Sequence, residues 1–185
     1  MVQSMSAQSR QECLRAVQKG DLEAFETLVV KYERPIFNYL YRVLGKKEDA
    51  EDVLQETFLK VYTHHRNIDP EQNFNAWLYR IATTTAYDFM RRNKQGRELF
   101  IIDDPENAFE TIDEDDTYNR IETGYDLEAA LQKLKPVYRT ALLLYYYEQF
   151  SYEDIARVLS VPLNTVKTYL SRAKQELKKQ YGTQS

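Results

Sequence analysis

The chain has 185 residues and contains few of the residues on which several protein classes depend. Its one cysteine, Cys13, excludes an internal disulfide and fits a reducing compartment. Five glycines and five prolines are too few for the many tight turns of a β-rich fold. The longest apolar run, residues 141–147, is far too short to cross a bilayer, and the N-terminus lacks the apolar segment of a secretory signal. These absences favour a helical protein of the cytoplasm.

Charge is distributed unevenly along the chain. The formal net charge is −4, but residues 95–126 contain eleven acidic residues and only two basic ones, so the rest of the chain is positive overall. The same stretch contains Gly96, Pro105 and Gly124 and few regular apolar repeats, which is typical of a flexible linker. We therefore predict an all-α fold of two small helical domains, residues 9–94 and 127–181, joined by an acidic linker at residues 95–126.

Apolar residues recur at helical spacing throughout the first domain. Helices are expected at residues 9–19, 22–44, 47–65 and 74–92. Gly20 and Gly45 should end the first two helices, and Asp21 and Asn73 should cap the second and the fourth. Pro35 is expected to bend the second helix.

Residues 151–174 have the pattern of a helix-turn-helix. Ser151 can cap a short first helix, with Asp154 as its reciprocal partner. Ser160 and Val161 form the turn, and Pro162 suits the first position of the second helix, where its missing N–H costs nothing. The residues left facing outward on the second helix are Thr165, Lys167, Thr168, Ser171, Arg172 and Lys174. This cation-rich face favours reading of the DNA major groove over a generic helical hairpin.

An acidic face on the third expected helix has two interpretations. Asp49, Asp52 and Glu56 lie three and four residues apart and therefore share one side, with Gln55 beside them. A solvated surface is the simpler interpretation. A docking surface for a basic partner is the functional one.

The fourth expected helix combines cations and aromatic residues. The members of this set are Phe74, Trp77, Arg80, Thr84, Tyr87, Arg91, Arg92 and Lys94. Cations can hold phosphates while aromatic faces stack on unpaired bases, so the set suits single-stranded nucleic acid. Aromatic residues at this spacing also pack in ordinary helical cores, and the sequence leaves both interpretations open.

Catalysis and metal binding have no positive support in the sequence. His64 and His65 are adjacent and point to different sides of a helix, and no Cys or carboxylate cluster completes a ligand set. We read both as surface residues. No glycine-rich phosphate loop and no acid, base and nucleophile set is present, so we expect neither an enzyme nor a cofactor.

Three segments together resemble bacterial sigma factors of the extracytoplasmic-function (ECF) type, within the sigma-70 family. They are residues 49–58 (DAEDVLQETF), residues 74–82 (FNAWLYRIA) and the helix-turn-helix. The resemblance covers both domains, from about residue 20 to residue 177. It implies a transcription initiation factor that binds core RNA polymerase and directs it to promoters.

The resemblance also implies a role for each surface. The first domain would bind the polymerase clamp through Asp49, Asp52, Gln55, Glu56 and Phe58. It would read the melted −10 element around a flipped-out base, through Ile68, Asn73, Phe74, Trp77, Arg80, Thr84, Tyr87, Arg91 and Arg92. The second domain would read the −35 duplex through Asn164, Thr165, Lys167, Thr168, Ser171, Arg172 and Lys174. The acidic linker would thread into the polymerase.

Three positions depart from the family pattern. Thr84 stands where the family commonly has Asn, and it lacks an amide, so the identity of the flipped base does not carry over. Asn164 and Tyr169 stand where the family often has Gly and Arg. Tyr169 is expected to remove a cation from the DNA-facing side, which would alter the −35 preference.

The expected partners are core RNA polymerase, promoter DNA and an anti-sigma factor, often a membrane-anchored one, with no small-molecule substrate. Two other functions stay open from the residues. A stand-alone helix-turn-helix regulator would bind promoter duplex tightly without polymerase. A helical adaptor that binds only proteins would show no salt-dependent DNA binding.

Overall fold

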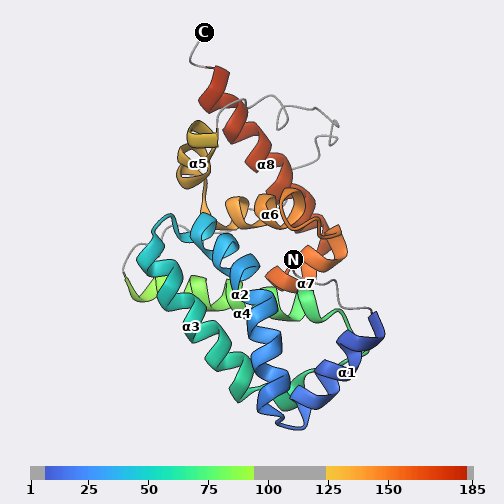
Figure 1. The fold of residues 1–185 in the computed structure, drawn as a ribbon. Coiled ribbons are helices and arrows are strands. Elements are labelled where there is room, and N and C mark those ends of the chain that lie inside the picture. The colour runs from blue at the N-terminus through green and yellow to red at the C-terminus, as the bar shows by residue number, and fades with distance from the viewer. Residues whose placement is uncertain (1–6, 94–123, 183–185) are drawn as a thin grey trace.

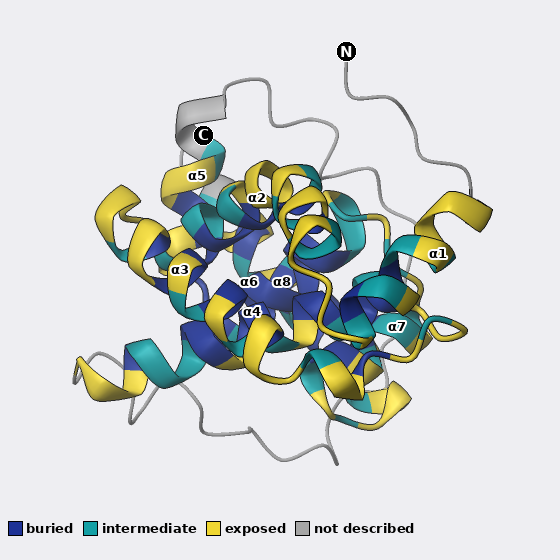
Figure 2. Cartoon of the chain, turned by 60° about the horizontal axis from the view of Figure 1, so that its bottom comes forward, coloured by how far each residue is buried: buried dark blue, intermediate teal, exposed yellow. Residues whose placement is uncertain are grey.

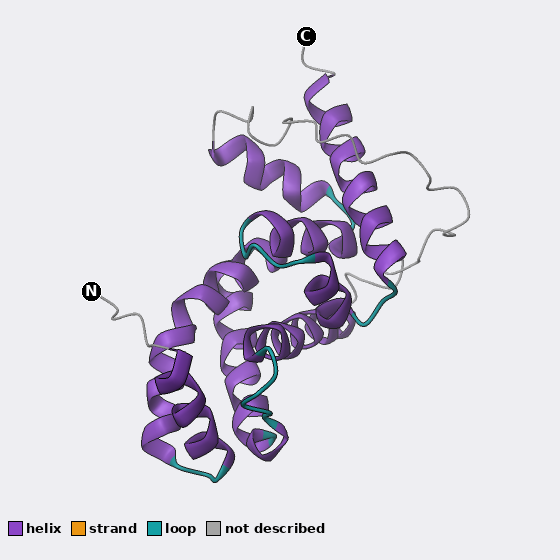
Figure 3. Ribbon diagram, turned by 90° about the vertical axis from the view of Figure 1, so that its right-hand side faces the viewer, coloured by secondary structure: helices purple, strands orange, loops and turns teal. Residues whose placement is uncertain are grey.

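The computed structural model describes residues 7–93 and 124–182, and all regular structure in these residues is helical (Figure 1, Figure 3). The elements are α1 (Ala7–Gln18), α2 (Leu22–Leu44), α3 (Lys47–Thr63), the 3-10 turn η1 (His65–Asn67), α4 (Phe74–Arg92), α5 (Gly124–Lys133), α6 (Pro136–Tyr146), α7 (Tyr152–Leu159) and α8 (Leu163–Gly182). The all-α prediction is confirmed. Nearly all of the predicted acidic linker lies outside the described residues.

Local signals in the sequence set the ends of α1 and α2. Gly20 adopts φ +89° between the two helices, and the Asp21 carboxylate caps α2 by accepting a hydrogen bond of 3.0 Å from the Ala24 N–H. Gly45 ends α2 in the left-handed region at φ +80°. Pro35 is exposed, and α2 continues through it as one helix of 23 residues.

The first domain packs α1, α3 and α4 around α2. Tyr39 of α2 is 1% exposed, its hydroxyl lies 2.6 Å from the Thr83 hydroxyl of α4, and its ring meets Tyr79 edge to face. α3 ends two residues before its expected end. There the Nδ1 atoms of His64 and His65 lie 2.8 and 2.6 Å from carbonyl oxygens of the last turn. The Asn73 side chain caps α4 as predicted.

The second domain contains the predicted helix-turn-helix. Ser151 caps α7 by accepting a hydrogen bond from the Asp154 N–H, and its hydroxyl also donates to the Asp154 carboxylate. Ser160 forms the turn in the left-handed region at φ 55°. Pro162 precedes α8 rather than starting it, and its carbonyl accepts the first helical bond, from Thr165. The predicted place of Pro162 is therefore corrected by one residue, and the predicted helix-turn-helix is confirmed.

The two domains pack directly against each other, an arrangement that the sequence had left open. α7 lies across α4, and the buried residues of both domains form one continuous core (Figure 1, Figure 2). The segment from α6 to α7, residues 147–151, takes part in this contact, and we name it the contact loop. Its Phe150 ring meets Tyr79 edge to face at 5.1 Å, and Tyr147 lies under the Arg42 guanidinium at 4.3 Å. The Tyr79 hydroxyl also donates to Glu148.

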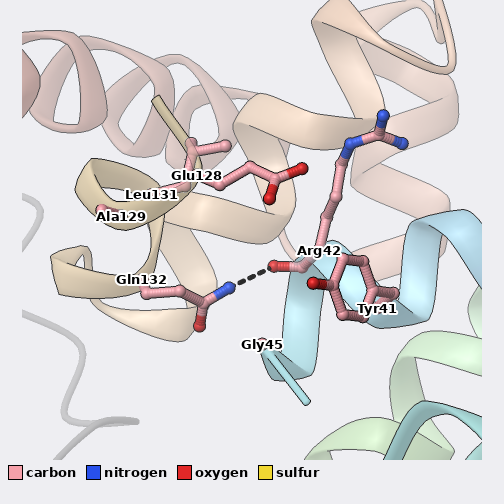
Figure 4. Close-up of a pocket in the computed structure, with 7 residues that line it drawn as sticks. All are labelled: Tyr41, Arg42, Gly45, Glu128, Ala129, Leu131 and Gln132. Atoms are coloured by element: carbon pink, nitrogen blue, oxygen red, sulfur yellow. Dashed lines mark hydrogen bonds between the residues drawn. The ribbon is translucent and has the colours of Figure 1, made fainter. Parts of the chain in front are cut away.

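A second contact joins the C-terminal end of α2 to α5 (Figure 4). The Gln132 side chain donates a hydrogen bond of 2.8 Å to the Arg42 carbonyl beside a surface cavity of about 290 Å³. A Cβ at Gly45 would lie 2.6 Å from the Gln132 side chain, so glycine permits this close approach as well as its own positive φ. Buried Arg139 donates in turn to Gln132, and burial lowers the pKa of its guanidinium to about 10.

Candidate nucleic-acid interface

A surface cavity of about 320 Å³ lies between α3, η1 and α4. Its lining residues are Lys60, His64, Asn67, Trp77, Arg80, Ile81, Thr84 and Thr85. The cavity therefore combines an indole, two cations, an amide and short hydroxyls around one concave surface. Three of the residues predicted to read the −10 element, Trp77, Arg80 and Thr84, lie together here.

The polar groups of this cavity are partly engaged by the protein itself. The Thr84 hydroxyl donates to the Arg80 carbonyl at 2.8 Å, which leaves its oxygen lone pairs to accept. Lys60 donates to the Thr85 hydroxyl at 3.1 Å and pairs with Glu56 at 2.9 Å. Arg80 is exposed, and within the described residues its guanidinium has no ion-pair partner. Arg80 is thus the cation of the cavity best placed to meet an added phosphate or base.

Two predicted −10 residues, Ile68 and Phe74, are buried, and a third, Tyr87, is half-buried. Ile68 is 1% exposed. It lies in a loop, where helical periodicity does not indicate which way a side chain points. Phe74 is 5% exposed, with its ring 5.4 Å from Tyr32 and 5.7 Å from Trp77. Tyr87 points its hydroxyl toward Thr140 of the second domain, and burial raises the pKa of this hydroxyl. The burial of Ile68 and Phe74 leaves their side chains supporting the cavity rather than lining it, whereas a base contact by the half-buried Tyr87 stays a prediction.

The predicted cations at the end of α4 are held in ion pairs. Arg92 donates to the Glu56 carboxylate at 2.8 Å, and Arg91 pairs with Asp88. The Arg92 hydrogen bond, with a second one from Lys60, lowers the pKa of Glu56. Glu56 therefore ties α3 to α4 and is not a free member of the acidic face. Asn73, also a predicted −10 residue, is exposed and donates to Asp154 of α7 at 3.1 Å.

The acidic face of α3 is narrower than the sequence predicts. Asp52 and Gln55 are exposed and Asp49 is half-buried. Phe58 is only 8% exposed and supports this face from below, because it points into the core with Val61. Leu59 is 65% exposed beside these polar residues, and the prediction had missed it. The sequence could have revealed it, because Leu59 is an apolar residue out of phase with the buried positions of α3.

α8 presents most of its predicted DNA-reading residues. Asn164 and Lys167 are exposed, and the half-buried members are Thr165, Thr168, Ser171, Arg172 and Lys174. Tyr169, however, is 5% exposed and packs on Tyr138 of α6 at 5.6 Å. It faces the core, so the expected loss of a DNA-facing cation there is wrong. The Tyr138 hydroxyl in turn accepts a hydrogen bond of 3.4 Å from Arg172.

Residues 7–93 and 124–182 contain no group of three His, Cys, Asp or Glu side chains that could hold a metal ion. Within the same described ranges, no helix has the length and apolar character needed to cross a membrane.

Comparison with known proteins matches both halves of the chain to one family. The Sigma-70 region 2 family model matches residues 28–96, and the model of Sigma-70, region 4 matches residues 125–177. The ECF RNA polymerase sigma factor SigW of Bacillus subtilis is 32% identical over 176 residues, which cover 90% of this chain and 94% of that protein. The chain belongs to the ECF sigma factors. The RNA polymerase sigma-H factor of Pseudomonas aeruginosa is likewise 32% identical and covers 95% of each chain.

Solved structures share the fold of this sigma factor. CnrH, in complex with the cytosolic domain of CnrY, superimposes with a TM-score of 0.70 at 22% identity and covers 97% of this chain and 100% of that one. RpoE of Bartonella quintana, in complex with the anti-sigma factor NepR, gives a TM-score of 0.66 at 24% identity and covers 89% and 100%. At these identities the likeness shows the fold alone.

Each of the two family models covers one of the two candidate DNA-binding surfaces. The region 2 match contains α3, η1 and α4 with their cavity, and the region 4 match contains the helix-turn-helix. The sigma factor is therefore an alternative sigma factor, a transcription initiation factor that acts with core RNA polymerase on promoter DNA. Lys60, His64 and Asn67 were absent from the predicted site because only the fold brings them to the cavity.

Proposed function

We propose that this ECF sigma factor reads the melted −10 strand with the cavity between α3, η1 and α4, and the −35 duplex with the first half of α8. The observation that carries the proposal is the convergence of Trp77, Arg80 and Thr84 on one concave surface. A base that leaves the stack needs an aromatic or apolar wall, hydrogen-bonding groups and a nearby cation for its phosphate. The cavity offers each of these groups.

The −35 reading rests on the geometry of the helix-turn-helix. α8 follows the turn at Ser160, and its first half exposes Asn164 and Lys167 with Thr165 and Thr168 on either side. In this motif the N-terminal residues of the second helix meet base edges in the major groove. The stand-alone regulator is less favoured because it leaves the cavity of the first domain without a role. An adaptor that binds only proteins leaves both the cavity and the cation-rich side of α8 without a role.

Core polymerase would dock on the outer face of α3. We assign this contact to Asp52, Gln55 and Leu59, with Asp49 at the edge, because they are the polar and apolar groups of α3 left accessible. An exposed leucine on the same helix face as the Asp52 carboxylate suits a partner surface that is both basic and apolar. An anti-sigma factor is the proposed inhibitory partner of this protein. The proposed site of action is the cytoplasm, where core polymerase transcribes.

The first experiment is reconstitution with purified bacterial core RNA polymerase, followed by transcription from a promoter library. We expect stoichiometric binding and start sites that share two spaced upstream elements. Binding of duplex DNA by the protein alone, with no binding to core, would support the stand-alone regulator and overturn the proposal. Absence of both would support the adaptor.

The docking face has a separate test. The double variant Asp52→Lys with Leu59→Ser should weaken core binding by about tenfold or more, since it reverses a charge and removes the apolar contact. Glu56 is left intact, because its replacement would also break the pairs with Lys60 and Arg92. Glu12→Lys on exposed α1 is the matched charge control. Equal core affinity of the double variant and the wild type would remove this face from the assignment.

A further inference from the structure

The loop between α3 and α4, residues 64–73, is fastened to α1 by side chains. The Gln18 side-chain amide donates a hydrogen bond of 2.8 Å to the Ile68 carbonyl, and this bond is partly buried. The Glu71 carboxylate accepts from Arg15 at 2.7 Å and from Gln11 at 3.2 Å. Contacts therefore run from one side of α1 to two points of the loop, which is about fifty residues away along the chain.

These tethers differ in strength. The Arg15–Glu71 pair is exposed on both sides, 57% and 62%, and an exposed pair of this kind contributes little. The Gln18 bond lies beside the Ile68 side chain, which is 1% exposed and anchors the loop in the core. A carbonyl in such a position needs a donor from the protein. Gln18 is thus the tether that fixes the middle of the loop.

The tethered loop forms part of the cavity wall. His64 and Asn67 line the cavity from the loop side, while Trp77, Arg80 and Thr84 line it from α4. Asn67 precedes Ile68 directly, so a movement of the Ile68 backbone carries Asn67 with it. Among the described residues, Gln18 is the side chain of α1 that bonds to the loop at Ile68. Nearby, the Asp69 carboxylate accepts hydrogen bonds from the Glu71 N–H and the Gln72 side chain, both within the loop.

We infer that Gln18 is a positioning residue for base selection: it holds the Ile68 carbonyl, and through it the Asn67 side of the cavity, at a fixed distance from α4. This inference rests on the proposed function of the cavity and adds α1 to it. Gln18 itself lines no part of the cavity. Its role is to keep the cavity the same width for every base that enters, so that a poorly fitting base is rejected instead of accommodated.

The test uses holoenzyme assembled from core polymerase and the full chain, with a promoter library randomised over the −10 element. Thr84→Val first identifies the base position that the cavity reads, as the one position at which the preference changes. Gln18→Met keeps the length of the side chain but removes the donor. We expect it to lower the preference at that same position by about 3- to 10-fold, as for loss of one hydrogen bond. Preferences elsewhere and core affinity should stay at wild-type values.

Two further variants separate positioning from simple loss of stability. Gln18→Lys restores a donor of similar reach and should recover most of the preference. Glu12→Ala, on the same helix and exposed, is the matched control and should behave as wild type. An unchanged preference in Gln18→Met, or a uniform loss at all positions together with a lower melting temperature, would overturn the inference. A wild-type profile with no preference anywhere in the −10 element would instead overturn the proposed function of the cavity.

Discussion

Glu148 shows how one side chain can join the two domains. It stands in the contact loop of the second domain and accepts a hydrogen bond from the Tyr79 hydroxyl of α4. Burial raises the pKa of its carboxyl, while the Tyr79 hydrogen bond and the positive charge of Arg42 oppose the shift only in part. The closed contact therefore favours the neutral form of Glu148 more than water does.

This shift predicts a pH dependence of the domain contact. The pKa of a free glutamate is 4.5 and that of Glu148 is higher, so the closed form binds the proton more tightly. Ionising Glu148 therefore destabilises the closed form. This destabilisation is absent below pH 4.5 and grows as the pH rises from there through the raised pKa. Glu148→Gln keeps an acceptor for Tyr79 without the charge, so we expect its melting temperature to exceed that of the wild type near neutral pH, with a smaller difference in acid. Glu153→Gln, exposed on α7, is the control, and parallel pH curves for all three proteins would contradict the prediction.

At the scale of single elements, the sequence predicted what local bonds decide. Asp21, Asn73 and Ser151 cap helices through bonds that span only three residues, so their roles could be read in advance. Ile68, Phe74 and Tyr169 were placed wrongly because tertiary packing decides their direction. The domain contact could not be predicted either: Tyr79 and Glu148 are 69 residues apart, and periodicity identifies an apolar side of a helix without naming its partner.

The reading side of α8 gives a prediction for this element. Arg172 is half-buried, and its guanidinium donates a hydrogen bond to the Tyr138 hydroxyl, which holds it on the side of α8 proposed to read DNA. Arg172→Ala should weaken −35 duplex binding by holoenzyme by roughly 1–3 kcal/mol and relax the preference at one base pair. Lys179→Ala, in the last turn of α8, should weaken binding slightly and without base preference. Footprints and affinities equal to wild type for Arg172→Ala would exclude it from base contact.

At the scale of the whole molecule, the closed arrangement conflicts with simultaneous reading of two elements. Tyr79 of the first domain and Phe150 of the second have ring centroids 5.1 Å apart. Promoter elements centred about 25 base pairs apart are separated by roughly 85 Å along a duplex. We therefore expect the domains to part when both elements are bound, so that the contact loop gives up its partners Arg42 and Tyr79.

Loosening the contact loop should make that separation easier. Tyr147→Ser with Phe150→Ser removes the ring under Arg42 and the ring against Tyr79 but leaves both domain cores in place, since these two side chains are not fully buried. We expect a larger radius of gyration by small-angle X-ray scattering, because the two ring contacts that hold the contact loop against α2 and α4 are lost. Phe25→Ala, which removes a ring packed on Tyr62 far from the contact loop, is the matched control and should scatter like the wild type. An unchanged radius in the double variant would mean that the α2–α5 corner, with Gln132 bound to the Arg42 carbonyl, suffices to hold the domains together.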